Sequence, residues 1–258
     1  MLNLRHFPGD PNRPAIGLHC MMGSGALFDP LSQRLDGMID LHTFDFPGHG
    51  RSPDWPLPEA EGMGLHTFVT RYAAGMIQRP VDLIGHSFGA TVALRIAVGA
   101  PEAIRSLTLV EPVLFAAASL KARQGEEDRL MPLAEAGDWD EMLRRFLDDW
   151  GRPGAEIPTD GPQADRLRQQ IRMVAETNDR LMSDRADILR AGGLEGVDAP
   201  VMLIAGSESP AIIHEVLETL TARLPDVGRA TVPGAGHMLP VTHPDQFADL
   251  TRVNLERS

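Results

Sequence analysis

The sequence predicts an α/β protein, a mostly parallel sheet flanked by helices, and three observations support this prediction. Short apolar stretches that suit buried strands alternate with stretches of helical period. A serine framed by glycines stands between one of these strands and the helix that follows it. A long charged segment without strand signals then interrupts the alternation before it resumes. A chain of 258 residues can bury one large core that carries such an insertion.

The alternation is clearest in the first part of the chain. A short strand is expected at the amino terminus, and helices are expected at residues 64–78 and 88–100. The pattern predicts further strands at residues 15–19, 41–44, 81–84 and 107–110. Strands that alternate with helices in this way are typical of a parallel sheet covered on both faces.

Residues 113–197 break the alternation. They are charged and helical in period, and Trp139, Met142, Phe146 and Trp150 fall on one face of a helix. Strands at residues 201–205 and 229–232 and helices at 212–224 and 244–254 follow. We therefore predict a core made of residues 1–112 and 198–258, with residues 113–197 forming a helical lid over the carboxyl edge of the sheet.

Composition excludes several classes of function. A net charge of −12 argues against a nucleic acid as a binding partner, because binding to phosphates needs a basic surface. The single cysteine, Cys20, excludes an internal disulfide. The first ten residues contain no long apolar segment, and no apolar run reaches membrane-spanning length. These features predict a cytoplasmic protein without a membrane partner.

The motifs give no indication of a cofactor or a metal. The pairs of glycines at residues 23–25 and 48–50 lack the third glycine of a dinucleotide-binding loop. The chain contains neither an H-E-x-x-H motif nor cysteines at zinc-binding spacing. We therefore expect chemistry that depends on side chains alone.

Residues 85–89, Gly-His-Ser-Phe-Gly, form the most informative motif. They join an apolar strand to a helix rich in small residues, which is the context of a nucleophile elbow. Glycine is needed on both sides because a side chain there would collide with the neighbouring strand or helix. The context predicts that Ser87 is a nucleophile. A tight turn without a chemical role is the alternative.

With these motifs in place, the chain resembles the lid-bearing, esterase-like members of the α/β-hydrolase superfamily over essentially its whole length. Four segments are similar to the family's oxyanion loop, its D-x-P-G-H-G-x-S loop, its elbow and its late histidine loop; they are residues 18–24, 45–52, 85–89 and 234–237. The resemblance implies an α/β-hydrolase fold with a helical lid insertion.

The resemblance also implies a role for individual residues. Ser87 would be the nucleophile and His237 the base, because the base follows the lid in this family. The backbone N–H groups of Met21 and Phe88 would form the oxyanion hole. Cys20 stands where the family usually has glycine, and a catalytic thiol is the rival interpretation of that residue. His19 is expected to orient the oxyanion loop by hydrogen bonding.

The acid of the triad is where this sequence departs from the family. Most relatives carry an aspartate in a G-x-x-D pattern after the strand that follows the lid, and here that position is Ser209. Glu111, directly after the strand at residues 107–110, is the favoured replacement, since dehalogenase-like and luciferase-like relatives place the acid there. Glu208 is the competitor. A Ser87–His237 dyad is the third alternative.

These residues predict a serine hydrolase that cleaves a small, apolar ester or related acyl compound without a cofactor or metal. Several apolar side chains near the predicted catalytic loops suggest an acyl pocket; they are Met21, Met22, Phe88, Met238 and Leu239. A carbon–carbon bond hydrolase, an amidase and a non-catalytic binding relative remain alternatives, because fold does not fix function. The oligomeric state, including a homo-oligomer, stays open.

Overall fold

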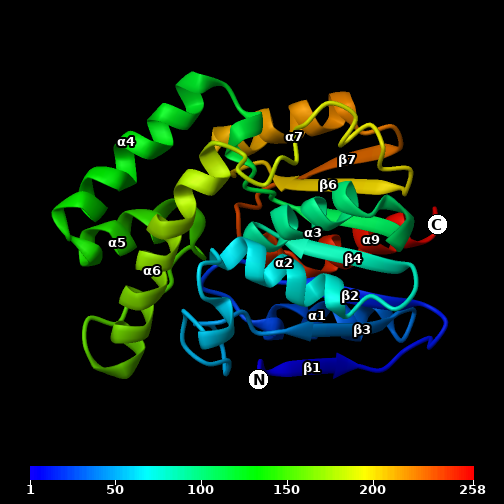
Figure 1. Cartoon of the computed structure of the whole chain (residues 1–258), viewed down its shortest axis with the longest axis horizontal. Helices are drawn as coiled ribbons and strands as arrows, with labels where there is room; N and C mark the ends of the chain where they lie inside the picture. Colours follow the sequence, from blue (N-terminus) through cyan, green and yellow to red (C-terminus); the bar gives the residue numbers. More distant parts are fainter.

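A computed structural model describes residues 1–258 and contains one seven-stranded sheet (Figure 1). The strand order is β1-β3-β2-β4-β5-β6-β7, and all neighbours pair in parallel except β1, which runs antiparallel to β3. The strands are β1 (Leu4–Phe7), β2 (Pro14–Leu18), β3 (Asp40–Phe44), β4 (Val81–His86), β5 (Ile104–Val110), β6 (Val201–Gly206) and β7 (Val227–Val232). The α/β-hydrolase fold and the mostly parallel sheet expected from the sequence are confirmed.

Helices cover both faces of the sheet. The helices of the core are α1 (Asp29–Leu35), α2 (Leu65–Gly75), α3 (Phe88–Gly99), α7 (Ala211–Arg223), α8 (Leu239–Thr242) and α9 (Pro244–Leu255). The sequence prediction found four of these six and missed the two short ones, α1 and α8. Both have a proline in the first turn and too few residues to show a helical period.

The two faces of the sheet build two separate apolar clusters. On the central strand β4, Leu83 points into the cluster shared with α2, α3 and α7, while the next residue, Ile84, points into the cluster shared with α1 and α9. Successive side chains of a strand point to opposite faces, so a strand covered on both sides buries the side chains of both faces. This arrangement explains why β4 and β6 are buried along their whole length.

Residues 113–197, here called the helical insertion, connect β5 to β6. The insertion contains α4 (Leu120–Ala136), α5 (Trp139–Trp150) and α6 (Gly161–Met182), and residues 183–197 follow without a further helix. Its three helices stand beyond the carboxyl ends of the parallel strands, in green and yellow in Figure 1. That edge of a parallel sheet is where ligands usually bind. None of the helices combines the length and apolar composition that crossing a membrane requires.

Candidate active site

Ser87 occupies the sharp turn between β4 and α3. Its backbone has φ +57° and ψ −118°, an unusual conformation for a residue with a side chain. The flanking glycines make the turn possible, because a Cβ atom on Gly85 would lie 2.6 Å from Ala90 Cα and one on Gly89 would collide with the Leu18 carbonyl oxygen. The nucleophile-elbow geometry expected from the sequence is therefore present.

The loop after β2 brings Met21 to the same place. Met21, Ser87 and Phe88 line one pocket together. The backbone N–H groups of Met21 and Phe88 make no hydrogen bond to another protein group. The Phe88 N–H opens helix α3, where unpaired donors and the helix dipole both favour negative charge. Both donors expected for an oxyanion hole are thus free to receive a ligand oxygen.

His19 fixes the loop that carries Met21. Its Nε2 accepts a hydrogen bond from the Phe46 N–H at 2.9 Å, so its Nδ1 is the protonated nitrogen and donates to the Cys20 carbonyl at 2.7 Å. Burial lowers the pKa of His19 to about 3, with the nearby His49 ring adding to the effect. A ring that stays neutral at every ordinary pH keeps one tautomer, and it ties this loop to the Asp45–Ser52 turn.

The Asp45–Ser52 turn has a structural part. The Asp45 carboxylate accepts hydrogen bonds from the backbone N–H groups of Gly25 and Arg51 and from the Asn3 side chain. The pKa of Asp45 is lowered by these hydrogen bonds, which outweigh the opposing effect of its burial. Asp45 therefore holds the turn against the loop of residues 20–25, and none of these hydrogen-bond partners lines the pocket.

Glu111 and His237 meet behind the pocket. Glu111 directly follows β5, is fully buried and has φ +52°, and its Oε2 lies 3.0 Å from His237 Nδ1. The contact that the sequence analysis expected between these two residues is present. A carboxylate at this distance accepts the Nδ1–H and leaves Nε2 of His237 free to take up a proton.

Ser209 holds the second oxygen of Glu111. The Ser209 hydroxyl donates to Glu111 Oε1 at 2.5 Å, and the Gly206 backbone N–H donates to the same oxygen at 2.7 Å. Ser209 stands at the position where the family usually has its aspartate. Ser209 thus supplies a hydrogen-bond donor to the carboxylate that contacts His237.

The two rival residues of the sequence analysis lie elsewhere. Glu208 is exposed, lines a separate groove, and its carboxylate forms no hydrogen bond or ion pair with His237, which pairs with Glu111. Cys20 is buried, and burial raises the pKa of its thiol to about 12, which keeps it protonated and unreactive. The geometry gives no support to Glu208 as the acid or to Cys20 as a nucleophile.

Two contacts on His237 could not be read from the sequence. The His237 carbonyl accepts a hydrogen bond at 2.9 Å from Nε2 of His86, the residue before Ser87. The Trp150 ring from α5 stands edge-on to the His237 ring, with centroids 4.8 Å apart and an interplanar angle of 89°. The first contact ties the loop of the base to the elbow, and the second brings the helical insertion against the base.

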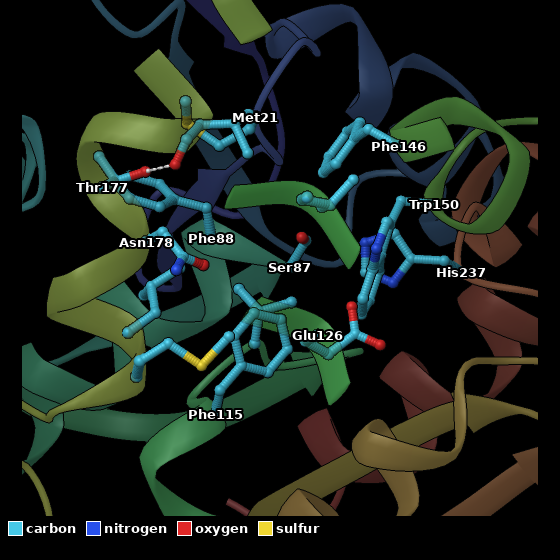
Figure 2. A pocket seen from close by; sticks show the side chains of 15 residues that line it. Met21, Ser87, Phe88, Phe115, Glu126, Phe146, Trp150, Thr177, Asn178 and His237 are labelled. Carbon is cyan, nitrogen blue, oxygen red and sulfur yellow. Dashed lines mark hydrogen bonds between the residues drawn. The ribbon is translucent and has the colours of Figure 1, made fainter. Parts of the chain in front are cut away.

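The pocket between the core and the insertion encloses a cavity of about 50 Å³ and is lined by residues of both parts. Figure 2 shows Ser87 between the Met21 and Phe88 side and the His237 and Trp150 side. No hydrogen bond joins Ser87 to His237 in this structure, although both line the pocket. Such bonds often tighten only when substrate binds.

The prediction of which apolar residues surround the pocket was only partly right. Met21 and Phe88 line it, but Met22 packs toward a small cluster of the insertion, and Leu239 is buried in the core on the α1 and α9 face of the sheet. Met238 does not line the pocket either. Most of the apolar wall comes instead from the insertion, including Phe115, Phe146 and Trp150. Proximity in sequence to a catalytic loop does not determine which way a side chain points.

Comparison with known proteins agrees with this geometry. Residues 16–250 match the alpha/beta hydrolase family. The chain belongs to this family. Its membership identifies the protein as an enzyme on an α/β-hydrolase fold, and the resemblance inferred from the four loop motifs is confirmed.

Individual relatives of this family member are hydrolases. A pimeloyl-[acyl-carrier protein] methyl ester esterase from Nitrosomonas europaea is 28% identical over 90% of this chain and 91% of its own. A putative carbamate hydrolase, RutD, from Klebsiella pneumoniae is 26% identical over 95% of this chain and 92% of its own. A hydrolase from Pseudomonas aeruginosa superimposes with a TM-score of 0.71 at 22% identity, covering 98% of this chain and 93% of that one, which supports the fold alone.

Proposed function

We propose that this enzyme is a serine hydrolase that cleaves a small ester or a related acyl compound through an acyl-enzyme intermediate. The observation that carries the proposal is the contact of Glu111 with His237 at the pocket that also holds Ser87. A strained, glycine-framed serine, an imidazole and a buried carboxylate are the three groups that acyl transfer needs.

In the proposed reaction, Ser87 Oγ attacks the carbonyl carbon of the ester while His237 Nε2 takes the serine proton. The oxyanion accepts hydrogen bonds from the Met21 and Phe88 N–H groups. His237 then returns the proton to the leaving alcohol, and the acyl group stays on Ser87. A water molecule, deprotonated by the same histidine, hydrolyses the acyl-enzyme and releases a carboxylic acid.

Glu111 acts on this reaction through His237. Its carboxylate keeps the proton of the imidazole on Nδ1 and stabilises the imidazolium that forms during each transfer. Ser209 and Gly206 hold the other oxygen of Glu111, so the carboxylate cannot turn away. We therefore propose the triad Ser87, Glu111 and His237.

We propose further that the helical insertion is a lid that shapes the substrate pocket. Ten of the fifteen residues around the pocket are hydrophobic, which favours a small apolar acyl group over a strongly polar one. Excluding water from such a site strengthens the electrostatic interactions inside it. An amidase or a carbon–carbon bond hydrolase would use the same residues, so the substrate series below must separate these reactions.

The test combines covalent labelling with turnover. A fluorophosphonate should label Ser87, and short p-nitrophenyl esters should be hydrolysed faster than the matching anilides. Ser87→Ala should abolish labelling and lower ester turnover by at least about 10³-fold with the fold unchanged by circular dichroism. Labelling at another serine, or normal turnover by Ser87→Ala, would contradict the proposal. A protein that binds esters without turnover would be a binding relative.

A further inference from the structure

The pocket contains two polar side chains that the proposed chemistry does not use. Both come from the insertion: Glu126 from α4 and Asn178 from α6. Thr177 also lines the pocket, but its hydroxyl donates to the backbone carbonyls of Met173 and Val174. The Asn178 side chain makes no hydrogen bond to the protein, and the Glu126 carboxylate accepts a hydrogen bond through one oxygen only. A polar group without a partner in an apolar pocket is available to a ligand.

Glu126 keeps negative charge at the pocket although an arginine is near. Its Oε2 accepts a hydrogen bond from Arg129 at 3.0 Å, while its Oε1 has no protein partner. Arg129 also forms an ion pair with Asp149. Two carboxylates therefore share one guanidinium, and the group of three carries one net negative charge. The Glu126 side chain is 18% exposed, so a ligand that pairs with it leaves little of it in water.

Aromatic rings surround the same end of the pocket. The rings of Phe115 and Trp150 have centroids 5.7 Å apart, and those of Phe146 and Trp150 are 6.4 Å apart. In Figure 2 the Glu126 carboxylate lies on the Trp150 and His237 side of the view, and Asn178 lies on the opposite side. Aromatic faces together with a carboxylate are the surroundings that attract an organic ammonium ion. A neutral acyl chain would gain from the rings but not from the carboxylate.

The outer side of Glu126 faces a groove of the same charge. Glu126 lines both the pocket and this groove, whose other carboxylates are Asp148, Asp149, Glu208 and Glu215. Its only cationic side chains are Lys121 and Arg129. An acidic approach to a pocket raises the local concentration of cations and repels anions. The groove alone would not identify a ligand, but it agrees in sign with the pocket.

We propose that the enzyme selects esters whose alcohol part carries an organic ammonium group, held between Glu126 and the aromatic rings. The proposal rests on the serine hydrolase function proposed above. His237 must deliver its proton to the leaving alcohol, so the alcohol part lies on the His237 side of the pocket, which is the side of Glu126. The reaction is ester plus water to carboxylic acid plus ammonium-bearing alcohol, with the ammonium group unchanged.

The experiment compares two substrates that differ in charge and hardly in shape: 2-(trimethylammonio)ethyl butanoate and 3,3-dimethylbutyl butanoate. The wild-type enzyme should show a kcat/KM at least about tenfold higher for the charged ester. Glu126→Gln, which keeps the size of the side chain, should remove most of this preference, measured as the ratio of kcat/KM between the two esters. The matched control is Glu127→Gln, because Glu127 is exposed on the same helix and lines neither the pocket nor the groove.

A second measurement does not depend on the choice of ester. Tetramethylammonium should inhibit the hydrolysis of p-nitrophenyl butanoate competitively in the wild type and in Glu127→Gln, and at least about fivefold more weakly in Glu126→Gln. Equal kcat/KM values for the two butanoates in the wild type, or a preference that survives Glu126→Gln, would overturn this inference alone. Loss of activity toward every ester, with no labelling of Ser87, would instead overturn the proposed function.

Discussion

The catalytic edge of the core and the helical insertion are built in opposite ways. In the core, Glu111 is fully buried, and both of its oxygens accept hydrogen bonds from fixed partners. In the insertion, most ion pairs lie at the surface, such as Arg144 with Glu141 and Arg168 with Asp140. Exposed pairs of this kind contribute about 0–1 kcal/mol each to stability.

This difference separates two tasks. The core fixes the reacting groups, where a displacement of about 1 Å can cost 10²-fold in rate. The insertion supplies most of the pocket wall and the two polar side chains that the proposed chemistry does not use, Glu126 and Asn178, so it is expected to decide which substrate fits. Core variants should therefore change kcat for all substrates, whereas insertion variants should change the ranking of substrates.

The largest effect is expected from the acid. Glu111→Gln should lower kcat at least about 10²-fold, because an amide can no longer stabilise the imidazolium and can present an N–H to Nδ1; the corresponding aspartate-to-asparagine change in serine proteases costs about 10⁴-fold. Stopped-flow turnover of p-nitrophenyl esters measures the effect. The control, Glu208→Gln, should cost less than about tenfold. The reverse ranking would place the acid at Glu208, and near-normal activity in both would leave a Ser87–His237 dyad.

Ser209, at the position where the family usually has an aspartate, allows a second test. Glu111→Gln/Ser209→Asp puts a carboxylate back where the family usually has it, and it should regain at least about tenfold in kcat over Glu111→Gln. Ser209→Ala alone should lower kcat by about threefold to tenfold, since it removes one donor from Glu111. If the double variant is no faster than Glu111→Gln, the loop after β6 no longer brings residue 209 to the base.

Substitutions of the two tryptophans of α5 should distinguish a role in the pocket from a role in packing the insertion. Trp150 lines the pocket and contacts His237, whereas Trp139 packs with the insertion's own cluster and under Arg172. Trp150→Ala should change the ratio of kcat/KM between butanoate and decanoate esters by about tenfold, because it enlarges the cavity. Trp139→Ala should leave that ratio within about twofold while lowering thermal stability. Equal shifts in both variants would mean that the insertion acts as one packed body.

Low pH should lower the stability of the core, because the core contains buried histidines. Burial lowers the pKa of His19 and His66 to about 3 and that of His49 to about 4, and the insertion contains no histidine. These rings are neutral in the folded state, whereas the unfolded chain takes up protons below about pH 6.5. The contribution of these neutral rings to the free energy of unfolding is complete above pH 6.5. It is lost as the pH falls toward 3, by at most about 1.4 kcal/mol per pH unit for each ring.

Urea unfolding at pH 7.5, 6.0 and 5.0 measures this loss. His19→Gln should unfold with a shallower dependence on pH than the wild type, because glutamine can replace the ring's two hydrogen bonds without titrating. The control is His214→Gln, a half-buried position on α7. Identical pH slopes for the wild type and His19→Gln would show that other groups cause the acid sensitivity.

The sequence predicted what depends on local pattern and left out what depends on distant contacts. The strands around Leu83 and the turn at Ser87 were found because apolar runs and paired glycines leave a clear trace in a single segment. The contacts of Trp150 with His237 and of Ser209 with Glu111 join residues far apart in the chain. The prediction of the pocket walls was partly wrong for the same reason, since Leu239 is near His237 in sequence but packs on the other side of the sheet.

The position of Glu111 has a consequence for building chimeric enzymes. The chain enters the insertion directly from this residue, through Pro112 and Val113, and a proline holds its own φ near −65°. Only a short, stiff segment therefore separates the proposed catalytic acid from whatever is attached after it. A foreign insertion should therefore be joined beyond Val113, with Glu111 and Pro112 kept as part of the recipient. Residues 183–197, before β6, should also be kept, because Ile188, Leu194 and Val197 are buried in the core cluster.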